Sequence, residues 1–296
     1  CRYCLAVTSG TAALQTAMAA FEVGPGDEVI LPAWTWHSCY TAIVLAGALP
    51  VFAEIDESFN IDPGDIESRI TSRTKALIAV HLQGNPADMD KIMAIARKHR
   101  LRVLEDCAQS VGGSYKGKPL GSIGDIGIYS LQVNKTITSG EGGAVVTNDP
   151  ILYERASRFH DVGGLREPHE KLVGKARLES FVGCNFRMSE FTGGVLLAQT
   201  RKLDAIISGV RAAARRVYDG IGDVPGIKLR YRPDPDGEIG VSVFVGFESK
   251  DRRDRYMGAL RKEGVRSSPP SGSVILPIQS YIERKRTVHP AWPTFN

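Results

Sequence analysis

Several features that mark whole classes of proteins are missing or scarce in this 296-residue sequence. Cysteine occurs only five times, at scattered positions, which does not favour a disulfide framework. Cys1 and Cys4 have C-x-x-C spacing, but without a second pair a zinc or redox interpretation is weak. The six histidines show no paired ligand spacing, so the sequence predicts no metal site.

Long apolar runs and blocks of like charge are also absent. No segment approaches about 18 uninterrupted apolar residues, and we see no signal peptide. The net charge is +4, and acidic and basic residues are interspersed, so no nucleic-acid-binding tail is indicated. We therefore expect a cytoplasmic protein in a reducing compartment that binds neither membrane nor nucleic acid. Its mild basicity favours anionic ligands.

What is present is an alternation of short apolar runs with helical patterns. Such alternation predicts parallel crossovers with helices on both faces of one sheet, which is an α/β fold. Functional residues of such folds gather beyond the carboxyl ends of the strands. The predicted strands are 28–32, 50–55, 75–82, 101–106, 126–131 and 143–148, and the predicted helices are 39–48, 63–70 and 87–99.

The pattern changes after about residue 150. We expect a large α/β domain over residues 1–190 and a smaller α+β domain over 191–296, joined by a long helix. The polar, glycine-bearing stretch 161–171 is expected to be a loop near the site. The later predicted elements are one helix from about Ser189 to Ile221, antiparallel strands at 226–233 and 241–247, and a helix at 250–264.

Four stretches at expected strand ends carry side chains that a binding site needs. The turn "TSGT" (8–11) precedes an alanine-rich helix and offers backbone amides to an anion. Asp106 ends a strand, and Lys135 follows the end of another. Trp34 and Trp36 follow a further strand. Each stretch alone has an ordinary explanation, namely a helix cap, a solvated lysine or core packing.

Together these stretches meet the needs of pyridoxal 5′-phosphate. The phosphate of this cofactor needs amides and hydroxyls, and its flat ring needs a stacking partner. Its ring nitrogen needs a carboxylate, and its aldehyde needs a lysine amine. The sequence therefore predicts a pyridoxal phosphate site at one edge of the sheet.

The stretches "SGTAAL", "VHLQGNPADMD", "EDCAQSVG", "YSLQVNKTITSGEGG" and "NFRMSE", in this order, resemble the DegT/DnrJ/StrS family of aminotransferases over about residues 5 to 265. The resemblance implies the three-layer sandwich of fold type I, with a mostly parallel central sheet and a smaller C-terminal α+β domain. It also implies amino transfer from L-glutamate or L-glutamine to a keto-sugar, mostly nucleotide-linked, or to a keto-cyclitol. Such reactions serve amino-sugar, antibiotic or surface-polysaccharide biosynthesis, in homodimers with shared active sites.

The resemblance also implies roles for individual residues. Lys135 occupies the Schiff-base position and would shuttle a proton, and Asp106 matches the carboxylate that pairs with the ring nitrogen. The other matches are Gln109 near the phenolic oxygen, Trp36 on the ring face with Trp34 as second choice, Gly10, Thr11 and Ser130 at the phosphate, and Asn185 at the phosphate of the neighbouring subunit.

Two alternatives stay open at this stage. A pyridoxal phosphate enzyme of another reaction type, such as elimination, decarboxylation or dehydration, would need the same cofactor residues. The dehydrating branch of the family has histidine where this chain has Lys135, which argues against that branch. A non-catalytic regulator on the same fold would not require the lysine.

Three further expectations concern residues outside this set. His81 is expected in the core, whereas Arg187 fits either a structural ion pair or an anion contact across the dimer. Only eight residues precede the "SGTAAL" turn, whereas family members usually carry some tens there. Substrate-contacting segments are therefore expected to be missing.

Overall fold

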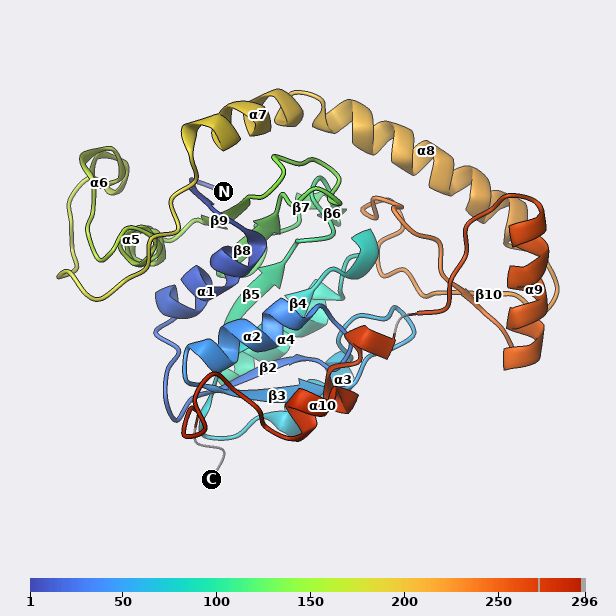
Figure 1. Cartoon of the computed structure of the whole chain (residues 1–296), viewed down its shortest axis with the longest axis horizontal. Helices are drawn as coiled ribbons and strands as arrows, with labels where there is room; N and C mark the ends of the chain where they lie inside the picture. Colours follow the sequence, from blue (N-terminus) through green and yellow to red (C-terminus); the bar gives the residue numbers. More distant parts are fainter. Residues whose placement is uncertain (271, 294–296) are drawn as a thin grey trace.

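The computed structural model describes residues 1–270 and 272–293, and a seven-stranded sheet forms its centre (Figure 1). The strand order is β1-β9-β8-β5-β4-β2-β3. Only β9 runs opposite to its neighbours, so six strands end at the same edge and the predicted mostly parallel sheet is confirmed. The strands are Tyr3–Val7 (β1), Glu28–Pro32 (β2), Leu49–Ala53 (β3), Thr74–Val80 (β4), Arg102–Asp106 (β5), Ile126–Ser130 (β8) and Gly143–Thr147 (β9).

Helices cover both faces of this sheet. Successive strand residues point to opposite sides, so both faces carry apolar side chains for the helices to bury. Along β5, Leu104 belongs to one hydrophobic core and Val103 to the other. The first core lies under α1 (Gly10–Ala20), α2 (His37–Leu45) and α5 (Pro150–His160). The second lies under α3 (Pro63–Arg69) and α4 (Met89–His99). The predicted three-layer arrangement is therefore present.

Two helices, rather than the predicted single long one, carry the chain across the molecule. They are α7 (Glu190–Thr200) and α8 (Leu203–Ile221), and they form the arch along one side in Figure 1. At the junction the Lys202 N–H bonds to the Gln199 carbonyl at 2.9 Å, one residue short of the α-helical spacing. Apolar periodicity does not register so local a tightening, which is why the sequence suggested one helix.

The region beyond α8 contains less strand than predicted. Lys228–Leu229 (β10) and Val245–Gly246 (β11) form the expected antiparallel pair, and α9 covers Lys250–Lys262. The rest is irregular because its main chain bonds to the large sheet's loops, as in the 3.1 Å bond from the Ile239 N–H to the Gly84 carbonyl. The division into two domains at residue 190 stays a prediction.

The short elements complete the fold. They are β6 (Ser114–Tyr115), β7 (Lys118–Pro119), α6 (Glu167–Val173), α10 (Ser280–Glu283), and 3₁₀ turns at Leu82–Gly84, Gly272–Val274 and Leu276–Ile278. Because α6 is helical, the prediction of a loop over 161–171 was wrong in its second half. Over the part of the chain that the structure describes, no helix is long and apolar enough to cross a membrane.

Residues 274–281, here called the C-terminal return, come back to the start of α2. The Leu276 N–H donates to the Ala33 carbonyl at 2.8 Å, and the Thr35 N–H donates to the Val274 carbonyl at 3.1 Å. The His37 ring stacks on Tyr281, and its Nδ1 lies 2.6 Å from the tyrosine hydroxyl. The segment that carries both tryptophans is thus held by a distant part of the chain.

Candidate active site

Asp106, the last residue of β5, is a buried carboxylate held on both oxygens. It is only 4% exposed. Oδ1 accepts the Ala108 N–H at 2.9 Å, and Oδ2 accepts the thiol of Cys39 with an S···O distance of 3.0 Å. A buried charge requires such donors, because water no longer stabilises it.

Lys135 lies in the connection between β8 and β9, residues 131–142, and is half-buried. Among the described residues its ammonium has no hydrogen-bond or ion-pair partner. Burial lowers the pKa of Lys135, and the negative charge of Asp106 offsets part of that effect. The neutral amine is therefore present at lower pH than for an ordinary lysine.

Gly10, Thr11 and Ser130 come together at the carboxyl edge of the sheet. Gly10 begins α1, and neither its N–H nor that of Thr11 has an acceptor within residues 1–270 and 272–293. A Cβ at Gly10 would lie 2.7 Å from the Cβ of Ser130, so the helix and β8 approach this closely only with glycine. Thr11 Oγ1 lies 2.8 Å from the hydroxyl oxygen of Ser38. Free amides and hydroxyls at a helix start form an anion site.

The two tryptophans differ in their surroundings. Trp34 is 8% exposed and packs edge-on against Phe59 and Phe244, with ring centroids 5.2 and 6.0 Å away. Trp36 is 57% exposed, and its ring lies edge-on to the ring of His37, with the centroids 5.6 Å apart. The first choice of the sequence prediction therefore has an open ring face, and the second is a core residue.

Gln109 and Asn185 occupy different places. Gln109 follows β5, and its Oε1 accepts the N–H of Gln83 at 2.8 Å. Asn185 is exposed and forms a β-bridge with Asp161. The next residue, Phe186, accepts the Thr8 N–H at 2.9 Å, so this segment runs beside the turn that leads into α1.

Arg187 forms an ion pair within the chain. Its guanidinium bonds to Asp161, which also pairs with Arg166. Burial opposes ionisation of Asp161, but the two arginines outweigh it and lower the pKa of that carboxyl. Of the two interpretations of Arg187, the structural ion pair is the one observed.

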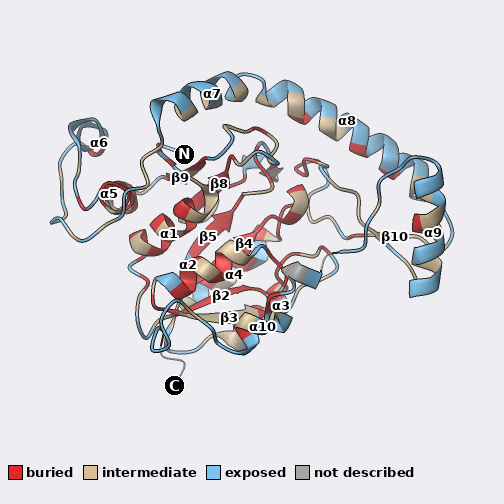
Figure 2. Ribbon diagram, viewed as in Figure 1, coloured by how far each residue is buried: buried red, intermediate tan, exposed pale blue. Residues whose placement is uncertain are grey.

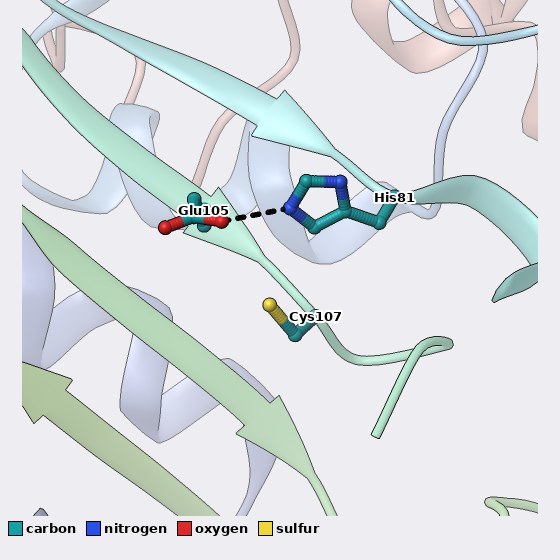
Figure 3. A group of neighbouring side chains, drawn as sticks. All are labelled: His81, Glu105 and Cys107. Carbon is teal, nitrogen blue, oxygen red and sulfur yellow. Dashed lines mark hydrogen bonds and ion pairs between the residues drawn. The ribbon is translucent and has the colours of Figure 1, made fainter. Parts of the chain in front are cut away.

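His81, Glu105 and Cys107 form a buried group of possible metal ligands (Figure 3). His81 Nδ1 accepts the Ala87 N–H at 3.1 Å, so Nε2 carries the proton and donates to Glu105 at 3.1 Å. The carboxylate also accepts three backbone N–H groups, at 2.6 to 2.9 Å. Burial raises the pKa of the Cys107 thiol well above its usual range. Because His81 and Glu105 are already engaged in hydrogen bonds and the Cys107 thiol is neutral, we interpret the group as structural, and His81 lies in the core.

Three residues that contact the predicted site residues were not predicted from the sequence. They are Cys39, which holds Asp106, Ser38, which bonds to Thr11, and Gln83, which bonds to Gln109. None has a sequence signal, because their positions depend on how α2 and the turn after β4 pack against β5.

The chemistry of these groups fits pyridoxal phosphate. Trp36 offers an uncovered aromatic face, and Lys135 an amine without a partner. Asp106 is a buried carboxylate with fixed oxygens, and Gly10 and Thr11 present free amides. This is the donor set that the aldehyde, ring and phosphate of the cofactor require.

Comparison with known proteins identifies the fold and the family of this chain. The sheet and its covering helices match those of pyridoxal phosphate-dependent transferases of fold type I. The chain belongs to the DegT/DnrJ/EryC1/StrS aminotransferase family, whose model matches residues 1–287.

Two relatives each match more than 70% of this chain. GDP-perosamine synthase of Escherichia coli O157:H7 is 41% identical over 214 residues, which cover 72% of this chain and 57% of the relative. L-glutamine:2-deoxy-scyllo-inosose aminotransferase of Micromonospora echinospora is 39% identical over 224 residues, which cover 74% of this chain and 53% of the relative. The chain thus spans just over half the length of these two relatives.

A solved structure covers more of the chain. DesV of S. venezuelae, in complex with a ketimine intermediate, superimposes with a TM-score of 0.83 at 32% identity. The match covers 98% of this chain and 75% of that one.

Proposed function

We propose that this protein is a cytoplasmic pyridoxal phosphate-dependent aminotransferase. It moves an amino group from L-glutamate or L-glutamine to a nucleotide-linked keto-sugar or a keto-cyclitol. The observation that carries the proposal is the half-buried, unpartnered amine of Lys135 within the field of the buried Asp106 carboxylate. The family supports the reaction class. The names of the two relatives support the two kinds of acceptor and, for the cyclitol, L-glutamine as donor.

The site residues divide the work of holding the cofactor. When bound, pyridoxal phosphate supplies an electron sink for the pair released at the donor Cα. Lys135 would hold it through the amine, Asp106 at the ring nitrogen, Trp36 on the ring face, Gln109 at the phenolic oxygen, and Gly10, Thr11 and Ser130 at the phosphate.

Lys135 and Asp106 then have distinct parts in the chemistry. The lowered pKa of Lys135 leaves its Nζ able to take the proton from the donor Cα. In the second half of the reaction, Nζ returns a proton to the acceptor carbon. Asp106 accepts a hydrogen bond on each oxygen, and its carboxylate would pair with the ring nitrogen of the bound cofactor. Trp36 excludes water from one ring face.

A second copy of the chain is part of the proposal. Helix α7 has no buried residue among those described, and Figure 2 shows it largely exposed. Phe191, Val195 and Leu197 on this helix are 92%, 51% and 57% exposed. An apolar helix left uncovered is typical of a subunit interface. We propose a homodimer in which Asn185, just before α7, reaches the phosphate of the neighbouring site.

The decisive experiment is an absorption spectrum of the protein loaded with pyridoxal phosphate, before and after L-glutamine or L-glutamate is added. We expect a visible band that shifts when the donor is added. Lys135→Ala should lose this band, and its turnover should fall by roughly 10³-fold. Aminated product from a GDP-linked keto-sugar or from 2-deoxy-scyllo-inosose would then identify the acceptor.

Other outcomes would point to the alternatives. A band that ignores both donors would favour another reaction type on the same cofactor, which product analysis would separate. Full turnover in the Lys135→Ala variant would contradict the assignment outright.

A further inference from the structure

Cys39 lies where it can control the orientation of Asp106. Its thiol is 3.0 Å from Oδ2, and both side chains are buried. We propose that Cys39 is a positioning residue, whose S–H donor fixes the Asp106 carboxylate so that it presents a constant edge to the cofactor ring. This inference rests on the proposed function, because it assigns the carboxylate to the ring nitrogen.

Two donors from different elements define the carboxylate plane. The Ala108 N–H, in the turn after β5, holds Oδ1 at 2.9 Å, and Cys39 in the first turn of α2 holds Oδ2. With one donor on each oxygen, rotation of the carboxylate about its Cβ–Cγ bond would break both bonds. Each oxygen keeps a second lone pair for a further donor.

The protonation state of Cys39 suits a donor rather than a nucleophile. Complete burial, and then the negative charge of Asp106, raise the pKa of the thiol well above its usual range. A thiolate here would place a second negative charge against the carboxylate. The hydroxyl oxygen of Thr35 lies 3.7 Å from Sγ on the same segment. The Cys39 thiol therefore keeps its proton and donates a hydrogen bond to Asp106.

The segment that contains Cys39 also carries Trp36, the aromatic residue proposed to lie on the cofactor ring. Trp36 is the residue just before α2, and its carbonyl accepts the Cys39 N–H at 3.3 Å. The C-terminal return holds this segment from outside through Thr35 and His37. The aromatic face and the carboxylate edge are thus fixed relative to each other by one short rigid segment, residues 35–39.

The hydrogen bond itself can be tested without cofactor. We would record the S–H stretching band of the apo protein by infrared spectroscopy and assign Cys39 by its loss in Cys39→Ser. We expect a band displaced from that of a free thiol, which moves back in Asp106→Asn because an amide oxygen is a weaker acceptor. A Cys39 band that is the same with Asp or Asn at position 106 would overturn the proposal.

The positioning role is tested by cofactor affinity. We expect Cys39→Ala to bind pyridoxal phosphate about three- to tenfold more weakly, as loss of one hydrogen bond implies. Cys39→Ser should retain most of the affinity of the unaltered protein. Cys107→Ser is the matched control, since Cys107 is equally buried but does not bond to Asp106, and its affinity should not change. Thermal unfolding of each variant would check that it is folded.

The results separate this inference from the proposed function. Equal affinity of Cys39→Ala and the unaltered protein would overturn the positioning role and leave the aminotransferase proposal standing. Equal weakening in the Ala and Ser variants would assign Cys39 to packing and also overturn it. Failure of the unaltered protein to bind the cofactor would instead overturn the proposed function, even with the infrared signature present.

Discussion

At the scale of single residues, the site depends on how burial and the neighbouring Asp106 affect the charge of Lys135. Burial favours the neutral amine, and the nearby carboxylate favours the ammonium. The chain thus places a base in a half-buried position while a fixed negative charge limits how far its pKa falls. Cofactor capture and proton transfer both need the neutral amine, so this balance sets the pH at which the site operates.

The balance predicts the direction of a pH shift. Asp106→Asn removes the charge that raises the pKa of Lys135, so that pKa should fall further. The pH at which half of the protein is captured by pyridoxal phosphate should therefore move downward. Borohydride trapping followed by mass spectrometry at Lys135 would measure it. Asp90→Asn, which removes an exposed carboxylate paired with Lys116, is the control. A midpoint that stays or rises in Asp106→Asn would contradict the electrostatic argument.

At the scale of elements, the close approach of α1 to β8 builds the anion site. Gly10→Ala would insert a methyl group 2.7 Å from the Cβ of Ser130. Because backbone atoms lie nearby, we expect a loss of about 1–3 kcal/mol in the free energy of unfolding, together with weaker cofactor binding. Denaturant titration would measure the first, and spectral titration the second.

A helical glycine with free space around it is the matched control. Gly209 in α8 has nothing within 4 Å of an added Cβ. Gly209→Ala should therefore leave cofactor binding unchanged and stabilise the protein by up to about 1 kcal/mol. If Gly10→Ala behaved like Gly209→Ala, the approach of α1 to β8 would not be as tight as described.

The strands of the parallel sheet could be predicted because they are buried apolar runs bounded by turns. The first strand, Tyr3–Val7, was missed although YCLAV is also an apolar run, because it overlaps the C-x-x-C pattern of Cys1 and Cys4, which was considered as a cysteine motif instead. Asp106, Ser130 and Lys135 lie at or just beyond strand ends, as the sequence predicted, while their roles at the cofactor stay a prediction. The hydrogen bond from the Cys39 thiol to Asp106 could not be predicted, since it depends on the packing of α2 against β5.

At the scale of the whole molecule, α7 presents an exposed apolar surface that a second subunit would cover. Phe191→Asp would place a charge at its most exposed apolar residue, so we expect the dimer to dissociate to monomers, with loss of activity. Sedimentation velocity would measure the mass. Val288→Asp is the control, because Val288 is also exposed, at 88%, but lies far from α7 in the sequence. Unchanged mass in Phe191→Asp would place the interface elsewhere.

The C-terminal return has a consequence for how the protein is made. His37 and Tyr281 are 244 residues apart in the chain, so the ribosome must add all of those residues before their contact can form. At about 5–20 residues per second, the wait is roughly 10 to 50 seconds. During that time the nascent chain carries an exposed tryptophan beside an incomplete cofactor pocket. Cofactor that binds before residue 281 has been added would thus meet Trp36 before the C-terminal return holds its segment.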